Sequence, residues 1–279
     1  MQPYTEKFYD AMREGTIRSA KEIIPIVLEF VQPKSVIDVG CGAGIWLSAL
    51  RECGIEDILG VDGEYVCQDQ LEIPKELFLA FDLTKPLVLD RKFDLAISLE
   101  VAEHLPPECA TSFVDSLTQL APVILFSAAI PFQGGTGHVN EQWIDYWIEC
   151  FRDKNYVPVD CMRSQIWRNS CVEYWYAQNM LILIREEYLE LEEYSLLKTA
   201  SNRTNFNGLP LVHPQKYLEM AENYAAERKV AQWYISEAER YAEKADLRNR
   251  SLREVLAVLP FLLKVSLQRR FFKASSLSS

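Results

Sequence analysis

The sequence lacks several features that would each assign it to a special class of protein. It has no run of about eighteen apolar residues, the length that a helix needs to span a bilayer. Its seven cysteines are scattered, and no two stand in CxxC spacing, which is typical of a reducing compartment. The N-terminal stretch MQPYTEKFYDAMREG has no apolar segment of the kind found in signal peptides. We therefore expect a cytoplasmic protein.

An excess of positive charge is also absent. The 279 residues contain 29 Lys and Arg against 40 Asp and Glu, a formal net charge of −11. Binding along nucleic acid without regard to sequence requires a basic surface, so we expect no long nucleic-acid partner. The charge does not exclude a small anionic substrate or the end of a nucleic acid. With 49% hydrophobic and 25% charged residues, the composition is that of an ordinary globular protein.

Short apolar segments alternate with helical stretches in the middle of the chain, a pattern typical of an open α/β sheet. The expected strands cover residues 35–40, 57–62, 77–83, 93–100, 123–131, 156–163 and 178–186, and the expected helices cover 45–53, 64–74, 109–120 and 140–155. The last helix is expected to begin at a capping Asn140. The last two strands have too few residues between them for a crossover helix, so they should pair antiparallel. The sequence thus predicts a Rossmann-like sheet of seven strands, mostly parallel, with an antiparallel last strand.

We divide the chain into an N-terminal helical cap, a sheet domain and a helical C-terminal extension: residues 1–32, 33–186 and 187–279. The cap has apolar positions at helical spacing, which Gly15 and Pro25 interrupt. A polar helix is expected over residues 215–250, and its thin apolar seam indicates packing either on a neighbouring element or on a second subunit, as in a homodimer. The apolar tail 252–273 is flanked by basic residues, so it is expected either to contact the inner face of a membrane or to dock on protein.

The segment VIDVGCGAG joins the first expected strand to a helix and contains an acid and three glycines: Asp38, Gly40, Gly42 and Gly44. Glycines at such a turn let backbone N–H groups approach a ligand closely. Asp62 ends the next strand, about twenty residues further on, where a carboxylate can accept both hydroxyls of a ribose. Asp82 ends the third strand, near the expected place of an adenine edge. Cys41, inside the turn, is expected there for its small size.

The motifs DVGCGAG, GVD, AFDL and FDLAISLEVAEHL, in that order and spacing, resemble the class I S-adenosylmethionine (SAM)-dependent methyltransferases over residues 17–186. The resemblance implies SAM as the cofactor, with its methionine part at the glycine-rich turn and its ribose at Asp62. Asp82, Leu83 and Leu99 are expected as further cofactor contacts. A nicotinamide-binding Rossmann enzyme is the alternative, but GCGAG does not satisfy the GxGxxG spacing of that class.

The segment SLEVAEH contains two acids and a histidine. Glu100 ends the fourth expected strand, and Glu103 and His104 follow it. In a helical turn, residues at i, i+3 and i+4 share one face. His138 follows the fifth strand and therefore emerges at the same edge of the sheet. Carboxylates and imidazoles together suit a divalent cation such as Mg²⁺, Mn²⁺, Fe²⁺ or Co²⁺. We predict a metal site of these four residues, with Glu103, His104 and His138 as the catalytic ones.

Two interpretations of this set stay open. EHL also follows the fourth strand in class I methyltransferases that hold no metal. If this chain holds no metal either, His138 is the candidate general base. The set ExxEH with a later histidine resembles the metal-dependent 2′-O-methyltransferases of small-RNA 3′ ends, in which the metal grips neighbouring hydroxyls. The stretch GGxxHVNEQW resembles bacterial methyltransferases thought to act on glycans or sugar precursors.

The expected function is therefore metal-assisted O-methylation of a vicinal hydroxyl on a sugar or glycan. Aromatic and amide side chains near the same edge suit sugar rings. Trp143 and Trp147 are expected in the core because they lie four residues apart on the expected helix, whereas the roles of Trp167, Arg168 and Trp175 are left open. The alternatives are a metal-free O-methyltransferase of small molecules, an RNA 3′-end 2′-O-methyltransferase, and a cofactor-binding scaffold of a biosynthetic assembly.

Overall fold

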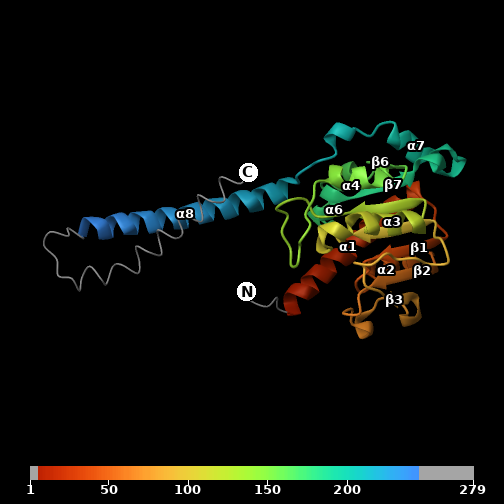
Figure 1. The fold of residues 1–279 in the computed structure, drawn as a ribbon, viewed down its shortest axis with the longest axis horizontal. Helices are drawn as coiled ribbons and strands as arrows, with labels where there is room; N and C mark the ends of the chain where they lie inside the picture. The colour runs from red at the N-terminus through yellow and green to blue at the C-terminus, as the bar shows by residue number, and fades with distance from the viewer. Residues whose placement is uncertain (1–5, 245–279) are drawn as a thin grey trace. The chain divides into compact units, whose positions relative to one another are not determined.

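The computed structural model describes residues 6–244, and within them the side chains of residues 13–240. The chain divides between His213 and Pro214 into two compact units, and the first of them contains the whole sheet (Figure 1). This division lies within the predicted C-terminal extension. The domain limits predicted at residues 32 and 186 stay predictions.

Seven strands form one sheet in the order β3-β2-β1-β4-β5-β7-β6. They are β1 Ser35–Val39, β2 Asp57–Asp62, β3 Phe78–Ala80, β4 Leu95–Leu99, β5 Val123–Ser127, β6 Tyr156–Val159 and β7 Leu181–Arg185. Strands β1 to β5 run parallel, whereas β7 pairs antiparallel with both β5 and β6. The predicted sheet, mostly parallel with an antiparallel last strand, is confirmed.

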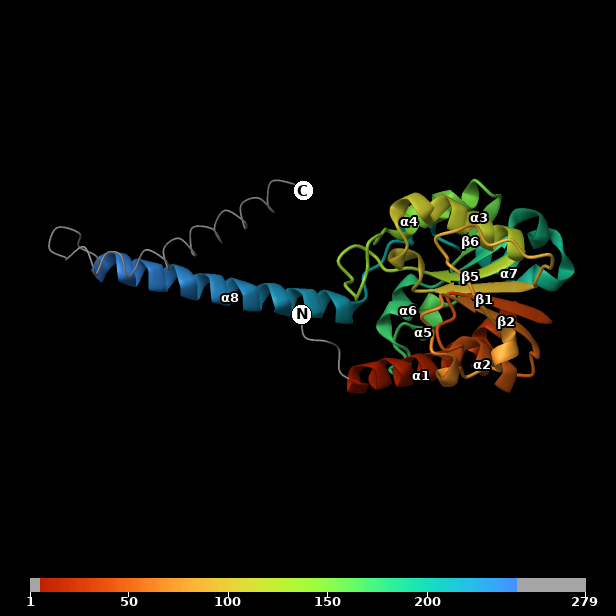
Figure 2. The same cartoon turned by 60° about the horizontal axis from the view of Figure 1, so that its bottom comes forward.

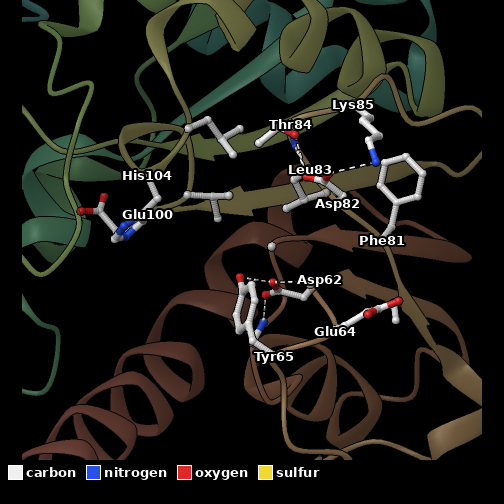
Figure 3. A pocket seen from close by; sticks show the side chains of 16 residues that line it. Asp62, Glu64, Tyr65, Phe81, Asp82, Leu83, Thr84, Lys85, Glu100 and His104 are labelled. Atoms are coloured by element: carbon white, nitrogen blue, oxygen red, sulfur yellow. Dashed lines mark hydrogen bonds and ion pairs between the residues drawn. The ribbon is translucent and has the colours of Figure 1, made fainter.

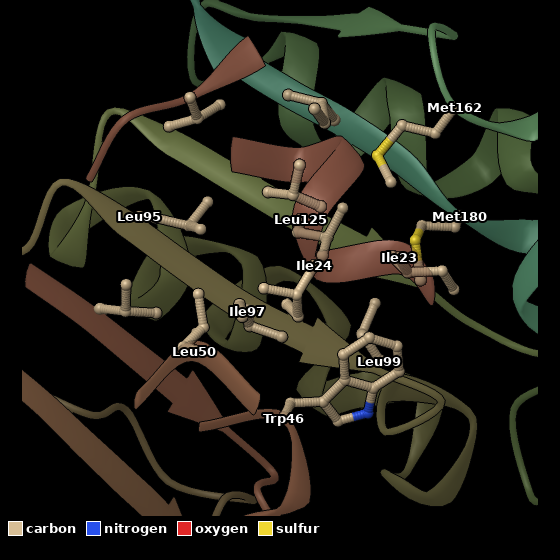
Figure 4. Close-up of a cluster of buried hydrophobic side chains, with 14 of the residues drawn as sticks. Ile23, Ile24, Trp46, Leu50, Leu95, Ile97, Leu99, Leu125, Met162 and Met180 are labelled. Atoms are coloured by element: carbon tan, nitrogen blue, oxygen red, sulfur yellow. The ribbon is translucent and has the colours of Figure 1, made fainter. Parts of the chain in front are cut away.

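Helices cover both faces of the sheet (Figure 2). They are α1 Glu6–Phe30, α2 Ile45–Glu52, α3 Ala110–Leu120, α4 Ile144–Arg152, α5 Arg163–Ile166, α6 Tyr174–Asn179 and α7 Ser195–Ser201. Helices α1, α2, α5 and α6 pack on one face, and α3 and α4 pack on the other. On the first face, Ile23 and Ile24 of α1 share a buried cluster with Ile97 and Leu125 of the sheet (Figure 4). Burial on both faces explains why the central strands are almost entirely apolar.

Two of the expected helical segments differ from the sequence pattern. Helix α1 continues through Gly15 and Pro25 as one helix, because its buried residues pack along the sheet on both sides of the proline. Residues 64–74 contain only the short 3₁₀ turn Gln68–Gln70 where a crossover helix was expected.

The helix expected from Asn140 onwards begins four residues later, at Ile144. Asn140 is buried, and its N–H donates to the carbonyl of Glu103 at 3.0 Å. The N–H of Gln142 donates to the carbonyl of Ala129 at 3.2 Å. These long-range hydrogen bonds hold the segment outside the helix, and Trp143 rather than Asn140 stands at the N-cap position.

Helix α8, Pro214–Lys244, is the described part of the second unit. It confirms the helix expected over residues 215–250 as far as residue 244, and residues 245–250 lie outside the described part. The tail 252–273 also lies outside it, so its contact with a membrane stays a prediction, as does the homodimer. Among residues 6–244, no helix combines the length and apolarity needed to cross a membrane.

Candidate functional site

The carboxyl ends of the parallel strands meet at one edge of the sheet, beside a cavity of about 1000 Å³. The segments that follow β1, β2, β3 and β4 supply its walls. Figure 3 shows three polar groups around it: Asp62 with Tyr65, Asp82 with Thr84 and Lys85, and Glu100 with His104. Residues predicted to bind the donor and residues predicted to bind a metal therefore line one cavity.

The turn after β1 has a backbone conformation that favours glycine. The φ angle is 90° at Gly40, 52° at Gly42 and 80° at Gly44. A Cβ atom at Gly40 would lie 2.3 Å from Cγ2 of Val101, so a side chain would also clash there. At Gly42, which lines the cavity, a Cβ atom would meet no described atom within 4 Å. Gly44 packs against Ile73 instead.

The carboxylate of Asp62, at the end of β2, is buried and holds this turn in place. Its Oδ2 accepts a hydrogen bond from the N–H of Gly42 at 2.7 Å, and its Oδ1 accepts one from the N–H of Gly63 at 2.7 Å. The hydroxyl of Tyr65 also donates to Oδ1. Because Tyr65 is 83% exposed, it is the partner that can leave Asp62 most easily.

Asp38, on β1, is 2% exposed, and its Oδ2 has no hydrogen-bond partner among the described residues. Burial, together with the charge of Asp62, raises the pKa of the Asp38 carboxyl well above its usual value. Asp38 is not among the described residues that line the cavity, so its contact with a cofactor stays a prediction. Cys41 is buried too, and burial raises the pKa of its thiol, which is consistent with a small apolar role.

Two of the three further contacts predicted for the cofactor lie at the cavity. Asp82 and Leu83 line it. The Oδ1 atom of Asp82 accepts hydrogen bonds from the hydroxyl of Thr84 at 2.6 Å and from its N–H at 3.1 Å, and these bonds lower the pKa of Asp82. Leu99 is 8% exposed, belongs to the apolar core and is not among the described residues that line the cavity. Its contact with a cofactor stays a prediction.

Glu100 follows β4 with a φ angle of 55°, which is uncommon for a residue with a side chain. Its N–H donates to both the carbonyl and the hydroxyl of Ser127, at 3.0 and 3.1 Å, and these bonds stabilise the turn. Its carboxylate accepts hydrogen bonds from the side-chain amides of Gln133, at 2.7 Å, and Asn179, at 3.1 Å. Burial nevertheless raises the pKa of Glu100 above its usual value.

Glu103, His104 and His138 come together at this end of the sheet. One ligand atom from each lies within 4.8 Å of the other two. The two imidazole rings have centroids 4.8 Å apart and planes 87° apart. Burial, followed by the neighbouring His138, lowers the pKa of His104, which favours the neutral form that binds metals. The structure thus brings together three of the four predicted metal ligands.

The side chain of Glu103 is the least solvated acid of the site. It lies in the 3₁₀ turn Ala102–His104, is fully buried, and neither of its carboxylate oxygens has a hydrogen-bond partner within the described chain. Burial and the charge of Glu100 raise the pKa of Glu103 well above its usual value. The nearby backbone N–H groups of Glu103 itself and of Ala129 lower this pKa, but by less than burial raises it. Glu100, whose oxygens already accept two amide hydrogen bonds, is close enough to exert this effect.

Three residues of the site were not predicted from the sequence: Gln133, Glu141 and Asn179. Gln133 follows the apolar stretch that contains β5, and Asn179 directly precedes the apolar stretch that contains β7, and amides in such places are often buried to bind other polar groups. Glu141 lies three residues after His138 in the chain, and its Oε1 is 2.8 Å from Nδ1 of that histidine.

The tryptophans of this region divide into buried and exposed positions. Trp147 is 1% exposed, which confirms its place in the core. Trp143 is 42% exposed, so the core position predicted for it is wrong. Helix α4 begins only after Trp143, so the two residues do not share a helix face. Trp167 contacts the ring of His213 at a centroid distance of 4.7 Å, and Arg168 is exposed.

Comparison with solved structures finds similar chains at low identity. The methyltransferase domain of bacterial CtHen1 is 19% identical, with 60% of this chain and 98% of that chain covered and a TM-score of 0.44. Magnesium protoporphyrin IX methyltransferase from Synechocystis PCC 6803 with bound SAH is 17% identical, with 66% and 90% covered and a TM-score of 0.46. An O-methyltransferase family protein from Burkholderia thailandensis is 12% identical, with 65% and 60% covered and a TM-score of 0.46.

The comparison with curated proteins found no match. A family model described as a methyltransferase domain matches residues 12–160, which include the glycine-rich turn, Asp62 and the complete SLEVAEH segment. This match covers more than half of the chain. The protein therefore belongs to the methyltransferase-domain family.

Proposed function

We propose that the protein is a SAM-dependent O-methyltransferase that uses a divalent cation to methylate a vicinal hydroxyl of a sugar or glycan. Its family supports methyl transfer. The observation that carries the finer proposal is the buried, unpartnered carboxylate of Glu103, which lies beside two imidazoles at the edge where the donor cavity opens.

The residues around the cavity fit SAM. Asp38 is two residues before Gly40, which lines the cavity, and its buried, unpartnered Oδ2 suits the ammonium group of the methionine part. The carboxylate of Asp62 can accept the ribose hydroxyls once the exposed Tyr65 turns away from Oδ1. Gly42 lets the backbone approach the ligand without a side chain in between. Asp82 lies at the same cavity, where it can meet the adenine edge.

A divalent cation fits Glu103, His104 and His138. A charged carboxylate that is fully buried requires a partner, and no described side chain donates to Glu103. One carboxylate oxygen and two imidazole nitrogens suit Mn²⁺, Fe²⁺ or Co²⁺, and additional oxygen ligands would suit Mg²⁺. When bound, such a cation supplies a Lewis acid that lowers the pKa of an acceptor hydroxyl.

The chain's own residues align the two substrates. Methyl transfer forms a bond between the acceptor oxygen and the methyl carbon while the bond from that carbon to sulfur breaks, and the hydroxyl proton must leave. Glu100 and His104 stand at one end of the cavity that Asp62 also lines (Figure 3). An acceptor held at that end faces the donor, and the carboxylate of Glu100 can orient one of its hydroxyls.

A second candidate is a metal-free O-methyltransferase with His138 as the general base. The contact of Nδ1 with the carboxylate of Glu141 favours it, because a carboxylate on one ring nitrogen orients the other to accept a proton. The two candidates use the same side chain in different ways. They differ in whether chelation of divalent cations stops the reaction.

A methyl-transfer assay tests the proposal. Protein treated with EDTA is incubated with methyl-labelled SAM and with pairs of acceptors that differ by one hydroxyl, such as a sugar and its deoxy analogue, and with a short RNA that carries a terminal diol. We expect transfer to a vicinal diol of a sugar only after Mn²⁺ or Mg²⁺ is added. Transfer that persists in EDTA supports His138 as the base, transfer to the RNA alone supports the RNA 3′-end activity, and no transfer to any acceptor supports a scaffold.

A further inference from the structure

We propose that Glu141 is the positioning residue that fixes the imidazole of His138, and with it the loop between β5 and α4. This inference rests on the proposed metal site. It adds a residue outside the predicted ligand set, one that is not among the described residues that line the cavity.

The carboxylate of Glu141 binds three donors from its own loop. Oε2 accepts a hydrogen bond from the N–H of Phe132 at 2.7 Å, and Oε1 accepts one from the N–H of Gly134 at 2.7 Å. Oε1 is also 2.8 Å from Nδ1 of His138. The side chain of Glu141 is 20% exposed and that of His138 is 12% exposed, so water competes only partly for these bonds. One carboxylate thus ties the start of the loop to the histidine near its end.

The loop needs such a partner. Phe132 has a φ angle of 66° and Gly134 one of 74°, and a residue with a side chain rarely adopts the first of these. Phe132 is also 79% exposed, so burial of its ring does not hold its backbone. The hydrogen bonds to Glu141 help to offset this local strain. Buried Gln133 also holds the loop, through its N–H to the carbonyl of Ile130 and its amide to Glu100, but neither of these bonds reaches His138.

The contact with Nδ1 also decides which nitrogen of His138 is a ligand. A carboxylate oxygen accepts a hydrogen bond only from a nitrogen that carries a proton. Nδ1 therefore carries the proton, and Nε2 keeps its lone pair. Histidines that bind metals generally donate their other N–H to a carboxylate or carbonyl in this way, which orients the ring and makes it more basic. Loss of such a partner typically lowers metal affinity by about 10- to 100-fold.

The test compares Glu141→Ala with Glu149→Ala as a matched control, because Glu149 is an exposed glutamate nearby in the chain. Calorimetry measures binding of Mn²⁺ and, separately, of SAH to the full chain. We expect Glu141→Ala to bind Mn²⁺ about 10- to 100-fold more weakly, with unchanged affinity for SAH, and Glu149→Ala to match the wild type. Glu141→Gln keeps one acceptor oxygen and should fall between them. In the wild type, ¹⁵N NMR should show the proton of His138 on Nδ1.

The outcomes separate this inference from the proposed function. If the wild type binds no divalent cation, the metal-assisted function is wrong, and NMR of the histidine tautomer still tests the Glu141 contact. If the wild type binds Mn²⁺ and Glu141→Ala binds it equally well, the inference alone is overturned. Should Glu141→Ala fail to fold, Glu141→Gln decides, since wild-type affinity for Mn²⁺ in that variant would also overturn it.

Discussion

A single methyl group at Gly135 should disable the candidate metal site without removing any ligand. A Cβ atom built there would lie 2.2 Å from Nε2 of His138 and 2.5 Å from Cε1, whereas ordinary contact begins at 3.4 Å. In Gly135→Ala the separation between the ring and the loop backbone must therefore grow by the difference between 2.2 and 3.4 Å, about 1.2 Å, which displaces the ring, the loop or both. Metal–ligand distances tolerate only about 0.2 Å. We expect the affinity for Mn²⁺ to fall at least about tenfold, or about 1.4 kcal/mol.

Titration calorimetry with Mn²⁺ measures this effect, and Thr136→Ala is the control, because Thr136 is the exposed neighbour in the same loop. Both variants should bind SAH like the wild type, since the donor contacts lie on other segments. Wild-type affinity for Mn²⁺ in Gly135→Ala would show that His138 is not held where a ligand must be. That result would refute the metal assignment of this histidine.

Three further predictions concern Glu103, Gly40 and Tyr65. Because burial and Glu100 raise the pKa of Glu103 from its usual 4.5, the metal-free wild type should lose stability as pH rises above that value. Glu103→Gln cannot ionise, so at pH 8 it should melt at a higher temperature than the wild type, whereas below pH about 4 the two should melt alike. Equal melting temperatures at pH 8 would contradict the burial argument. Gly40→Ala should bind SAH far more weakly, because its Cβ would clash with the neighbouring valine at 2.3 Å; fluorescence titration tests this. Tyr65→Phe should bind SAH more tightly, since no hydroxyl then competes for Asp62, and weaker binding would mean that the hydroxyl contacts the cofactor.

The sheet and the donor edge could be predicted from the sequence because their physical signals are local. Near-continuous apolar segments indicate strands that are buried on both faces. Glycines with positive φ angles mark the turn after β1, and Asp62 stands directly at the end of β2. The convergence of SLEVAEH with His138 follows from the parallel order of β4 and β5. The strand order places His138 at the correct edge of the sheet, although its exact position depends on the loop that carries it.

The loop between β5 and α4 could not be predicted in the same way. Asn140 and Glu141 have the composition of a helix start, but hydrogen bonds to Glu103 and Phe132 hold them outside the helix. Local propensity cannot reveal such partners, so the helix start and the exposure of Trp143 were both misjudged. The amide hydrogen bonds to Glu100 are equally non-local.

In the proposed function, Glu103, His104 and His138 hold a divalent cation next to the methyl donor. Crystals of the full chain grown with Mn²⁺ and SAH, measured at the manganese absorption edge, test it most directly. We predict one anomalous difference peak bonded to Glu103, His104 and His138, with SAH in the cavity that Asp62 lines. An SAH-bound structure at saturating Mn²⁺ with no anomalous peak at these three residues would contradict the claim.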